Sequence, residues 1–315
     1  METRRLGQSD IQIAPIMLGT NVFGWSVDAA TAFAILDGFV AGGFNAIDTA
    51  NSYSRWVPGH SGGESETIIG NWLKRSGKRD RVVIASKVGE DMGSGRGLTT
   101  GDIVREAEAS LKRLQVERID LYQTHFDDPN TAPEETLAAY AQLIAQGKVR
   151  AIGASNIGTA RLTQSLDASR RLGIARYESL QPLYNLYDRK GFEQDYEALC
   201  VREQLGVISY YSLAAGFLTG KYRSLADAAK SATRGGRVKQ YLDARGLRIL
   251  QALDAVAARH AATPAQVSLA WLMARPCVTA PIVSATSLTQ LTEILKSAQL
   301  KLAPVDIAAL DAVSA

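Results

Sequence analysis

The sequence predicts an α/β protein folded as a closed (β/α)8 barrel, the TIM barrel. Short apolar runs alternate with amphipathic segments along the 315 residues, and eight such units can be counted. Runs that are apolar almost throughout are typical of parallel strands covered by helices. Because parallel crossovers are right-handed and eight strands can close a barrel, closure is favoured. The predicted strands are Ile16–Leu18, Asn45–Asp48, Val82–Ser86, Ile119–Gln123, Ala151–Gly153, Ser179–Gln181, Val207–Tyr210 and Ala280–Ile282.

Two segments lie outside this repeat. Residues 1–14 precede the first strand and predict a short β-hairpin that closes the barrel floor, with a turn near residues 8–10. Residues 221–245 are polar and predict an inserted loop with some helix. No linker-like boundary and no low-complexity stretch interrupts the chain, so residues 1–315 are expected to form a single domain.

The intervening helices are placed by their capping residues. Asp28 is a suitable cap for a helix that runs to about Ala41, and Thr99 is a suitable cap for a later one. Pro133 is followed by two acidic residues, which is typical of a first helical turn. A further helix is expected over residues 66–75. Glycines are expected to end the helices, at Gly42, Gly77, Gly147, Gly173 and Gly206.

An open, doubly wound sheet is the alternative fold. Such a sheet normally carries a glycine-rich phosphate-binding loop after its first strand. This chain has Leu18-Gly19-Thr20-Asn21 at that place, which is not such a loop. The barrel is therefore preferred.

Composition argues against several classes of protein. Apolar residues make up 46% of the chain and charged residues 21%, which predicts a globular fold. The net charge of +3, with no block of lysine and arginine, argues against nucleic acid or a membrane surface as partner. Cys200 and Cys277 have no metal-ligand spacing, and no metal is expected. The start of the chain lacks the apolar core of a signal peptide, and we expect a cytoplasmic protein of unspecified oligomeric state.

Four polar residues follow or end apolar runs and carry the functional argument. Asp48, Lys87 and His125 stand at the ends of the second, third and fourth predicted strands, and Tyr53 lies just beyond the second. Because active sites of such barrels lie at the carboxyl ends of the strands, we expect these side chains to meet. Taken singly, each has a structural explanation, such as a turn, packing or a solvated lysine. Their joint placement favours a catalytic site.

The four residue types suit proton donation to a carbonyl group. A phenol titrates near pH 10 and donates poorly at neutral pH. A nearby ammonium favours the phenolate, so Lys87 is expected to lower the pKa of Tyr53, while Asp48 keeps Lys87 charged and oriented. His125 is expected to hydrogen-bond the carbonyl oxygen. Tyr53 then gives its proton as hydride arrives at the carbon.

At these residues the chain resembles the aldo-keto reductases, over about residues 5–297. Residues 43–53 resemble the first signature of that family. Residues 111–114, together with 119–125, resemble the second. The resemblance implies a (β/α)8 barrel that binds an extended nicotinamide dinucleotide without a Rossmann fold. It implies Tyr53 as the acid, with Asp48, Lys87 and His125 in the roles given above.

The resemblance also implies which residues bind the cofactor. Ser155, Asn156 and Gln181 correspond to the residues that hold the nicotinamide carboxamide, and Tyr210 to the aromatic residue stacked on its ring. Residues 212–221 correspond to the pyrophosphate loop, where glycine lets backbone N–H groups approach the phosphates. The complete set is Gly19, Thr20, Asp48, Ser155, Asn156, Gln181, Tyr210, Ser212, Leu213, Gly216, Leu218, Thr219, Lys221, Ser284, Thr286 and Gln290.

The chain departs from the family pattern at three places. Residues 54–63 lengthen the link after Tyr53, and from them Trp56, with Phe126, is expected to shape the substrate pocket. The proline usual after the stacking aromatic residue is missing. The segment expected to grip the adenosine 2′-phosphate, residues 281–290, offers hydroxyls and an amide where many relatives place lysine or arginine. NADPH is the expected cofactor, with NADH or dual use as the alternative.

Three functions are therefore open. The first is NADPH-dependent reduction of a small aldehyde or ketone. The second is a barrel aldolase in which Lys87 forms a Schiff base. The third is a non-catalytic sensor or regulatory subunit that binds a nicotinamide cofactor and needs a partner protein. The presence of all four catalytic residue types favours the first.

Overall fold

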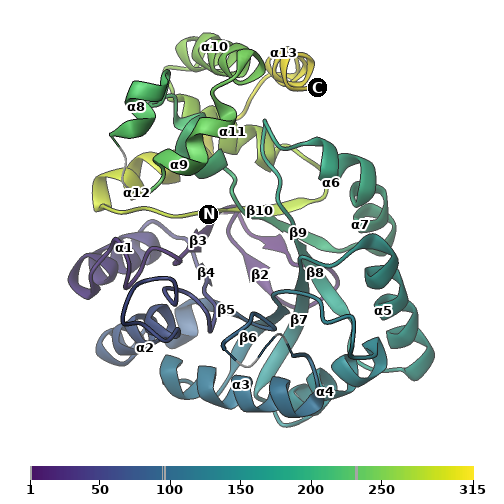
Figure 1. Ribbon diagram of the computed structural model, residues 1–315. Helices are drawn as coiled ribbons and strands as arrows, with labels where there is room; N and C mark the ends of the chain where they lie inside the picture. The colour runs from purple at the N-terminus through teal and green to yellow at the C-terminus, as the bar shows by residue number, and fades with distance from the viewer. Residues whose placement is uncertain (1, 94, 96, 231–232) are drawn as a thin grey trace.

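The structure, a computed structural model, describes residues 2–93, 95, 97–230 and 233–315 (Figure 1). Its centre is a closed barrel of eight parallel strands in the order β10-β3-β4-β5-β6-β7-β8-β9, as predicted. The strands are β3 (Met17–Gly19), β4 (Ala46–Asp48), β5 (Val83–Val88), β6 (Ile119–Thr124), β7 (Val149–Ser155), β8 (Tyr177–Gln181), β9 (Gly206–Ser209) and β10 (Val278–Val283). Each predicted run contributes a strand, and Tyr210 lies one residue beyond β9.

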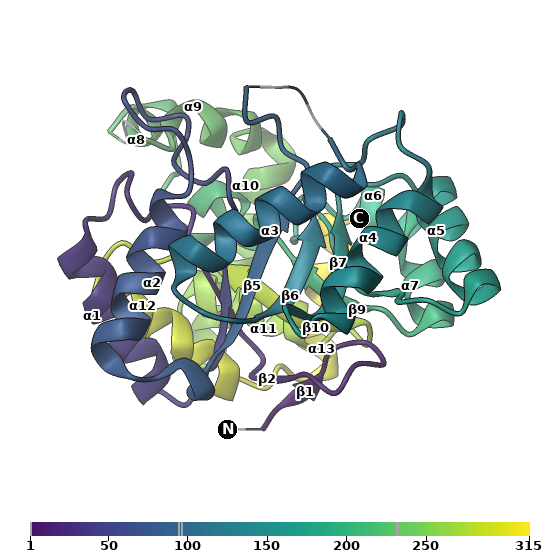
Figure 2. The same ribbon diagram turned by 90° about the horizontal axis from the view of Figure 1, so that it is seen from below.

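The predicted hairpin is present and closes the floor of the barrel. Strands β1 (Arg4–Arg5) and β2 (Gln12–Ile13) pair antiparallel. Leu6, Ile11 and Ile13 are buried in one apolar cluster with residues that line the barrel, among them Met17 and Leu121. Figure 2 shows the hairpin at the opposite end of the barrel from α8 and α9. The hairpin thus seals one end and leaves the other for a site.

Helices surround the barrel and begin at the predicted caps. The side chain of Asp28 accepts a hydrogen bond from the backbone N–H of Thr31, and that of Thr99 accepts one from Asp102. The helices are α1 (Ala29–Ala41), α2 (Glu64–Ser76), α3 (Thr100–Leu114), α4 (Pro133–Ala145), α5 (Thr159–Leu172), α6 (Lys190–Asp195), α7 (Glu197–Glu203), α10 (Ala244–Arg259), α11 (Pro264–Met273), α12 (Leu288–Leu295) and α13 (Pro304–Ser314). Short 3₁₀ turns are η1 (Arg79–Arg81), η2 (Ala214–Thr219), η3 (Lys239–Tyr241) and η4 (Lys296–Gln299).

One predicted helix end is wrong. Helix α7 ends at Glu203, and Gln204, not a glycine, adopts the left-handed conformation that follows it. Gly206 is instead the first residue of β9. A Cβ atom there would lie 2.8 Å from the backbone nitrogen of Gly7 in the hairpin loop, so close packing explains this glycine.

The inserted segment contains helix, as predicted. It forms α8 (Leu225–Ala229), α9 (Gly235–Val238) and η3. No helix in the described part of the chain is long and apolar enough to cross a membrane.

Candidate active site

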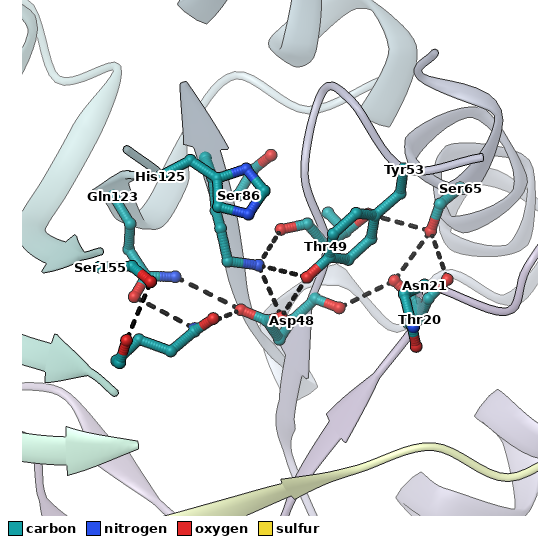
Figure 3. Close-up of polar contacts among 12 residues, drawn as sticks. Thr20, Asn21, Asp48, Thr49, Tyr53, Ser65, Ser86, Gln123, His125 and Ser155 are labelled. Carbon is teal, nitrogen blue, oxygen red and sulfur yellow. Dashed lines mark hydrogen bonds and ion pairs between the residues drawn. The ribbon is translucent and has the colours of Figure 1, made fainter. Parts of the chain in front are cut away.

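The register of the barrel brings the four predicted residues together. Strands β4 and β5 pair with Asp48 opposite Ala85, and β5 and β6 pair with Lys87 opposite Gln123. Asp48 is the last residue of β4, Lys87 lies near the end of β5, and His125 follows β6 directly. The three residues thus lie at the same end of neighbouring strands. Figure 3 shows the rings of Tyr53 and His125 on the same side of Asp48.

Lys87 is the centre of the contacts. Its ammonium donates to Tyr53 Oη at 2.7 Å, to Asp48 Oδ2 at 2.7 Å and to the carbonyl oxygen of Thr49 at 2.8 Å. Tyr53 Oη donates to Asp48 Oδ2 at 3.1 Å. The Lys87 side chain is completely buried and that of Asp48 almost so, so both charges are screened little by solvent.

The pKa of Tyr53 is raised overall, and not lowered as expected. Burial, and then the negative charge of Asp48, raise the pKa of Tyr53 well above its ordinary value. Burial also lowers the pKa of Lys87, against the opposing effect of Asp48. Tyr53 therefore holds its proton firmly at neutral pH. It can give that proton up only to a group that is itself becoming strongly basic.

His125 lies beside the phenol and next to an unpredicted carboxylate. The rings of His125 and Tyr53 are in an edge-to-face arrangement with centroids 6.1 Å apart. His125 Nδ1 is 3.5 Å from Glu90 Oε2. The backbone N–H of His125 donates to the carbonyl oxygen of Val88 at 2.7 Å, which ties the end of β6 to β5. Glu90 follows β5 by two residues, and its place after a strand is the only signal the sequence offered.

The second oxygen of Asp48 is held by two amides. Asp48 Oδ1 accepts from Gln181 Nε2 at 3.0 Å and from Gln123 Nε2 at 3.3 Å. Gln181 was predicted as a cofactor residue, whereas Gln123 was not predicted as a site residue. Because both oxygens of Asp48 are occupied, the carboxylate cannot rotate without breaking several bonds.

A cavity of about 980 Å³ opens above these residues. Tyr53, Asp48 and His125 line it, while Lys87 lies buried below. Of the predicted cofactor residues, the cavity is lined by Gly19, Asp48, Ser155, Asn156, Gln181, Tyr210, Ser212, Leu213, Gly216, Thr219, Lys221, Ser284, Thr286 and Gln290. The site thus gathers residues from the ends of most barrel strands.

Thr20 and Leu218 do not line the cavity. Both are completely buried. Thr20 Oγ1 donates to the carbonyl oxygen of Asp48 at 2.8 Å and accepts from Ser65 Oγ at 2.8 Å. Figure 3 shows Thr20 and Ser65 on the far side of Asp48 from Gln123. The side chain of Thr20 thus supports the backbone of Asp48 and does not face the cavity.

The loop after β9 has an unusual backbone. Tyr211, Ala214, Ala215 and Gly216 all have positive φ angles, of 51°, 48°, 56° and 94°. The sequence indicated the glycine but not the two alanines. The N–H groups of Ala214 and Gly216 donate within the loop, to the carbonyl oxygens of Tyr211 and Leu213, which holds the loop in a tight turn. Lys221 lies beside this loop, because its Nζ would be 3.8 Å from a Cβ at Gly216.

Two unpredicted arginines also line the cavity. Arg234 lies over the ring of Trp25 at 5.6 Å, and Arg237 lies over the ring of Tyr211 at 5.2 Å. Both belong to the insertion, residues 221–245, which was expected to be polar and to help set the substrate, but neither arginine was predicted as a site residue. At the far end of the cavity the side chains of Thr286 and Gln290 are polar and uncharged. Gln290 Oε1 accepts hydrogen bonds from the backbone N–H and the hydroxyl of Thr286.

Aromatic rings form the wall near Tyr53. Trp56 is 51% exposed and packs edge-to-face against Trp25, with centroids 5.6 Å apart, and also against Tyr53. Phe126 packs against His125 with centroids 4.9 Å apart. Trp56 and Phe126, both predicted, line the cavity together with the unpredicted Trp25.

Comparison with known proteins decides the family. A family model described as the Aldo/keto reductase family matches residues 15–315. The chain belongs to this family. An uncharacterized oxidoreductase of Bacillus subtilis, YrpG, is 33% identical over 96% of this chain and 92% of its own length. Protein tas of Escherichia coli is 32% identical over 99% of this chain and 97% of its own length. A probable voltage-gated potassium channel subunit beta of Arabidopsis thaliana is 29% identical over 94% and 91%.

Family membership supports an oxidoreductase, and aldo/keto reductases generally bind NAD(P)H. The cavity of this aldo/keto reductase fits such a group. It is about 980 Å³ in volume, and it offers amides at one end and a loop of left-handed residues beside Lys221. Tyr210 Oη donates to Asn156 Oδ1 at 3.2 Å, which places an aromatic ring against the amide residues. Among the described residues no group of three or more His, Cys, Asp and Glu side chains is arranged to hold a metal ion.

Proposed function

We propose that this aldo/keto reductase reduces an aldehyde or ketone to an alcohol with NADPH, with Tyr53 as general acid. The observation that carries the proposal is the Tyr53 hydroxyl, which lies 2.7 Å from Lys87 Nζ and 3.1 Å from Asp48 Oδ2 at the base of the cavity. A phenol in contact with a buried ammonium is suited to donate a proton and to carry the charge left behind.

Each residue of the site has a separate role in the proposed reaction. When bound, the nicotinamide supplies hydride to the carbonyl carbon. Tyr53 holds its proton until negative charge develops on the carbonyl oxygen and then transfers it. The phenolate that results forms 2.7 Å from Lys87 Nζ, which stabilises it. Asp48 keeps Lys87 charged, and His125, edge-on to Tyr53, orients the carbonyl oxygen.

Ser155, Asn156 and Gln181 are proposed to hold the nicotinamide amide, and residues 211–221 the phosphates. Three cations line the cavity: Lys221, Arg234 and Arg237. Arginine and lysine side chains are the usual partners of phosphate groups. These cations support NADPH as cofactor, although Ser284, Thr286 and Gln290 carry no charge.

The test is the Tyr53→Phe variant, assayed with NADPH or NADH and an aromatic aldehyde by loss of reduced-nicotinamide absorbance. We expect kcat to fall by about 10²–10⁴-fold, the usual contribution of a general acid, with cofactor affinity unchanged. Tyr122→Phe is the matched control, because Tyr122 is completely buried and its hydroxyl has no hydrogen-bond partner among the described residues. Full activity of Tyr53→Phe would refute the proposed role.

A regulatory subunit is the second candidate, favoured by the relative described as a probable channel subunit beta. Tight cofactor binding with negligible turnover across aldehydes and ketones would support it. An aldolase is disfavoured, because Lys87 is completely buried and donates hydrogen bonds to Tyr53, Asp48 and Thr49. Borohydride trapping of a carbonyl compound on Lys87 would reverse that conclusion.

A further inference from the structure

A second buried carboxylate lies behind the strand that carries Lys87. Glu66, in the first turn of α2, is completely buried. Its Oε1 accepts a hydrogen bond from Ser86 Oγ at 2.5 Å, and its Oε2 accepts one from Arg113 Nε at 2.6 Å. Ser86 directly precedes Lys87 in β5. Glu66 is therefore tied to the backbone that positions the catalytic ammonium, from the side opposite the cavity.

Two glycines in and before α2 leave room for Arg113 beside Glu66. A Cβ atom at Gly63 would overlap the Arg113 side chain, and one at Gly70 would overlap the Arg113 carbonyl oxygen. Helix α2 can therefore approach α3 only because both positions are glycine. Arg113 belongs to the segment 111–114, which resembles a family signature but takes no part in the reaction described above. Its contact with Glu66 gives that segment a role.

Glu66 accepts hydrogen bonds at both of its carboxylate oxygens. A guanidinium and a hydroxyl donate to it, and the bond from the guanidinium is charge-assisted. The buried phenol of Tyr122, whose pKa burial raises, lies near both Glu66 and Glu106, and Glu106 accepts a hydrogen bond from Asn51. The Arg113 guanidinium, 2.6 Å from Glu66 Oε2, offsets part of the charge of Glu66.

That charge acts on Lys87. Burial lowers the pKa of Lys87, and three carboxylates oppose this effect: Asp48 by direct contact, and Glu66 and Glu90 through space. Tyr53 Oη and the carbonyl oxygen of Thr49 also contact the ammonium. A completely buried lysine needs such compensation to stay protonated.

We propose that Glu66, fixed by Ser86 and Arg113, is a positioning residue that keeps Lys87 protonated and aligned beneath Tyr53. This inference rests on the proposed role of Lys87 in carbonyl reduction. Glu66 itself does not touch the cavity, so it acts only through β5 and through its charge.

The test is Glu66→Gln, which keeps the shape and removes the charge. Two quantities are measured: the titration of Lys87 by NMR of ¹³C-labelled lysine side chains, and the pH dependence of kcat. We expect both midpoints to move to lower pH by roughly half a unit or more, since a neighbouring buried charge has effects of this order. Glu64→Gln is the control on the same helix, and cofactor affinity, measured by tryptophan fluorescence, should be unchanged in both variants.

Glu66→Asp, which restores the charge, should return both midpoints toward the unsubstituted values even if it lowers stability. Should Glu66→Gln fail to fold because it leaves Arg113 unpaired, the double variant Glu66→Gln/Arg113→Gln removes both charges. Its downward shift should be smaller than that of Glu66→Gln, because loss of the Arg113 cation acts in the opposite direction. Unchanged Lys87 titration in the folded variant would overturn the inference. If the unsubstituted protein showed no carbonyl reduction, the proposed function would fail instead, and the NMR titration would still decide the effect of Glu66.

Discussion

At the residue scale, the protonation of Tyr53 and Lys87 sets the pH dependence of the site. Burial and Asp48 raise the pKa of Tyr53, whereas burial lowers the pKa of Lys87 from 10.5. As pH rises, Lys87 therefore loses its charge before Tyr53 loses its proton. Reductase activity should be level through neutral pH and should fall through a midpoint below 10.5, because the phenolate then loses its stabilising ammonium. A kcat profile over neutral and alkaline pH checks this, and activity that rose steadily with pH would contradict it.

Thr20 offers a test that separates support from binding. Within the described residues its hydroxyl hydrogen-bonds with Asp48 O and Ser65 Oγ, both inside the protein. Thr20→Val should cost about 1 kcal/mol of unfolding free energy, the usual value of one hydrogen bond, and should leave the affinity for NADPH unchanged. Urea denaturation and fluorescence titration measure the two quantities. A large loss of affinity without loss of stability would restore Thr20 as a cofactor residue.

The sequence was sufficient to predict that residues at the ends of neighbouring strands lie together. Asp48, Lys87 and His125 follow from strand order alone. Gln123 does not, because its strand is buried on both faces and no alternation marks the side that faces the site. The direction of the Tyr53 pKa shift also could not be predicted, since it depends on how completely the phenol is buried.

At the element scale, the closest packing near the site is between α2 and α3. A Cβ atom at Gly70 would overlap backbone atoms of Arg113 and Leu114, which cannot move as a flexible side chain can. Gly70→Ala should therefore destabilise the protein by about 1–3 kcal/mol, the usual cost of overpacking, even though alanine favours helices. The free energy of unfolding in urea is the measurement.

Gly191→Ala is the control for that substitution. Gly191 also lies in a helix, α6, and a Cβ there would have no neighbour within 4 Å. It should be neutral or slightly stabilising, because alanine restricts the unfolded chain. Equal effects at the two glycines would show that α2 and α3 can separate without cost.

Glycines also explain where element prediction succeeded and failed. Gly77 and Gly173 end helices in the left-handed conformation, as their positions after helical segments indicated. Gly206 follows a helix in the same way, yet it is required by the approach of the hairpin loop. The sequence signals are alike because the contact that distinguishes them joins residues about 200 positions apart, as Gly7 and Gly206 are.

At the scale of the whole molecule, the barrel could be predicted because a short apolar run followed by an amphipathic helix repeats along the chain. The rim of the barrel was harder to predict, because the loops that form it come from distant positions in the sequence. Trp25, Trp56 and Arg234 form one contact group although the insertion lies far from the other two in sequence. No local pattern indicates such a meeting. The sequence indicated Trp56 and Phe126 for this wall, whereas Trp25 and Arg234 became apparent only from the structure.

The cavity spans strand ends around the barrel, so a ligand that fills it should stabilise the whole fold. A ligand that binds only the folded state adds about 2.7 kcal/mol at one hundred times its dissociation constant. NADPH should raise the midpoint of thermal unfolding more than NADH at equal concentration, because Arg234 and Arg237 line the cavity in addition to the proposed pyrophosphate loop. Arg237→Gln should reduce the shift with NADPH more than the shift with NADH, since only the former carries the additional phosphate. Equal shifts with the two cofactors, before and after the substitution, would instead assign these cations to the pyrophosphate that both cofactors share.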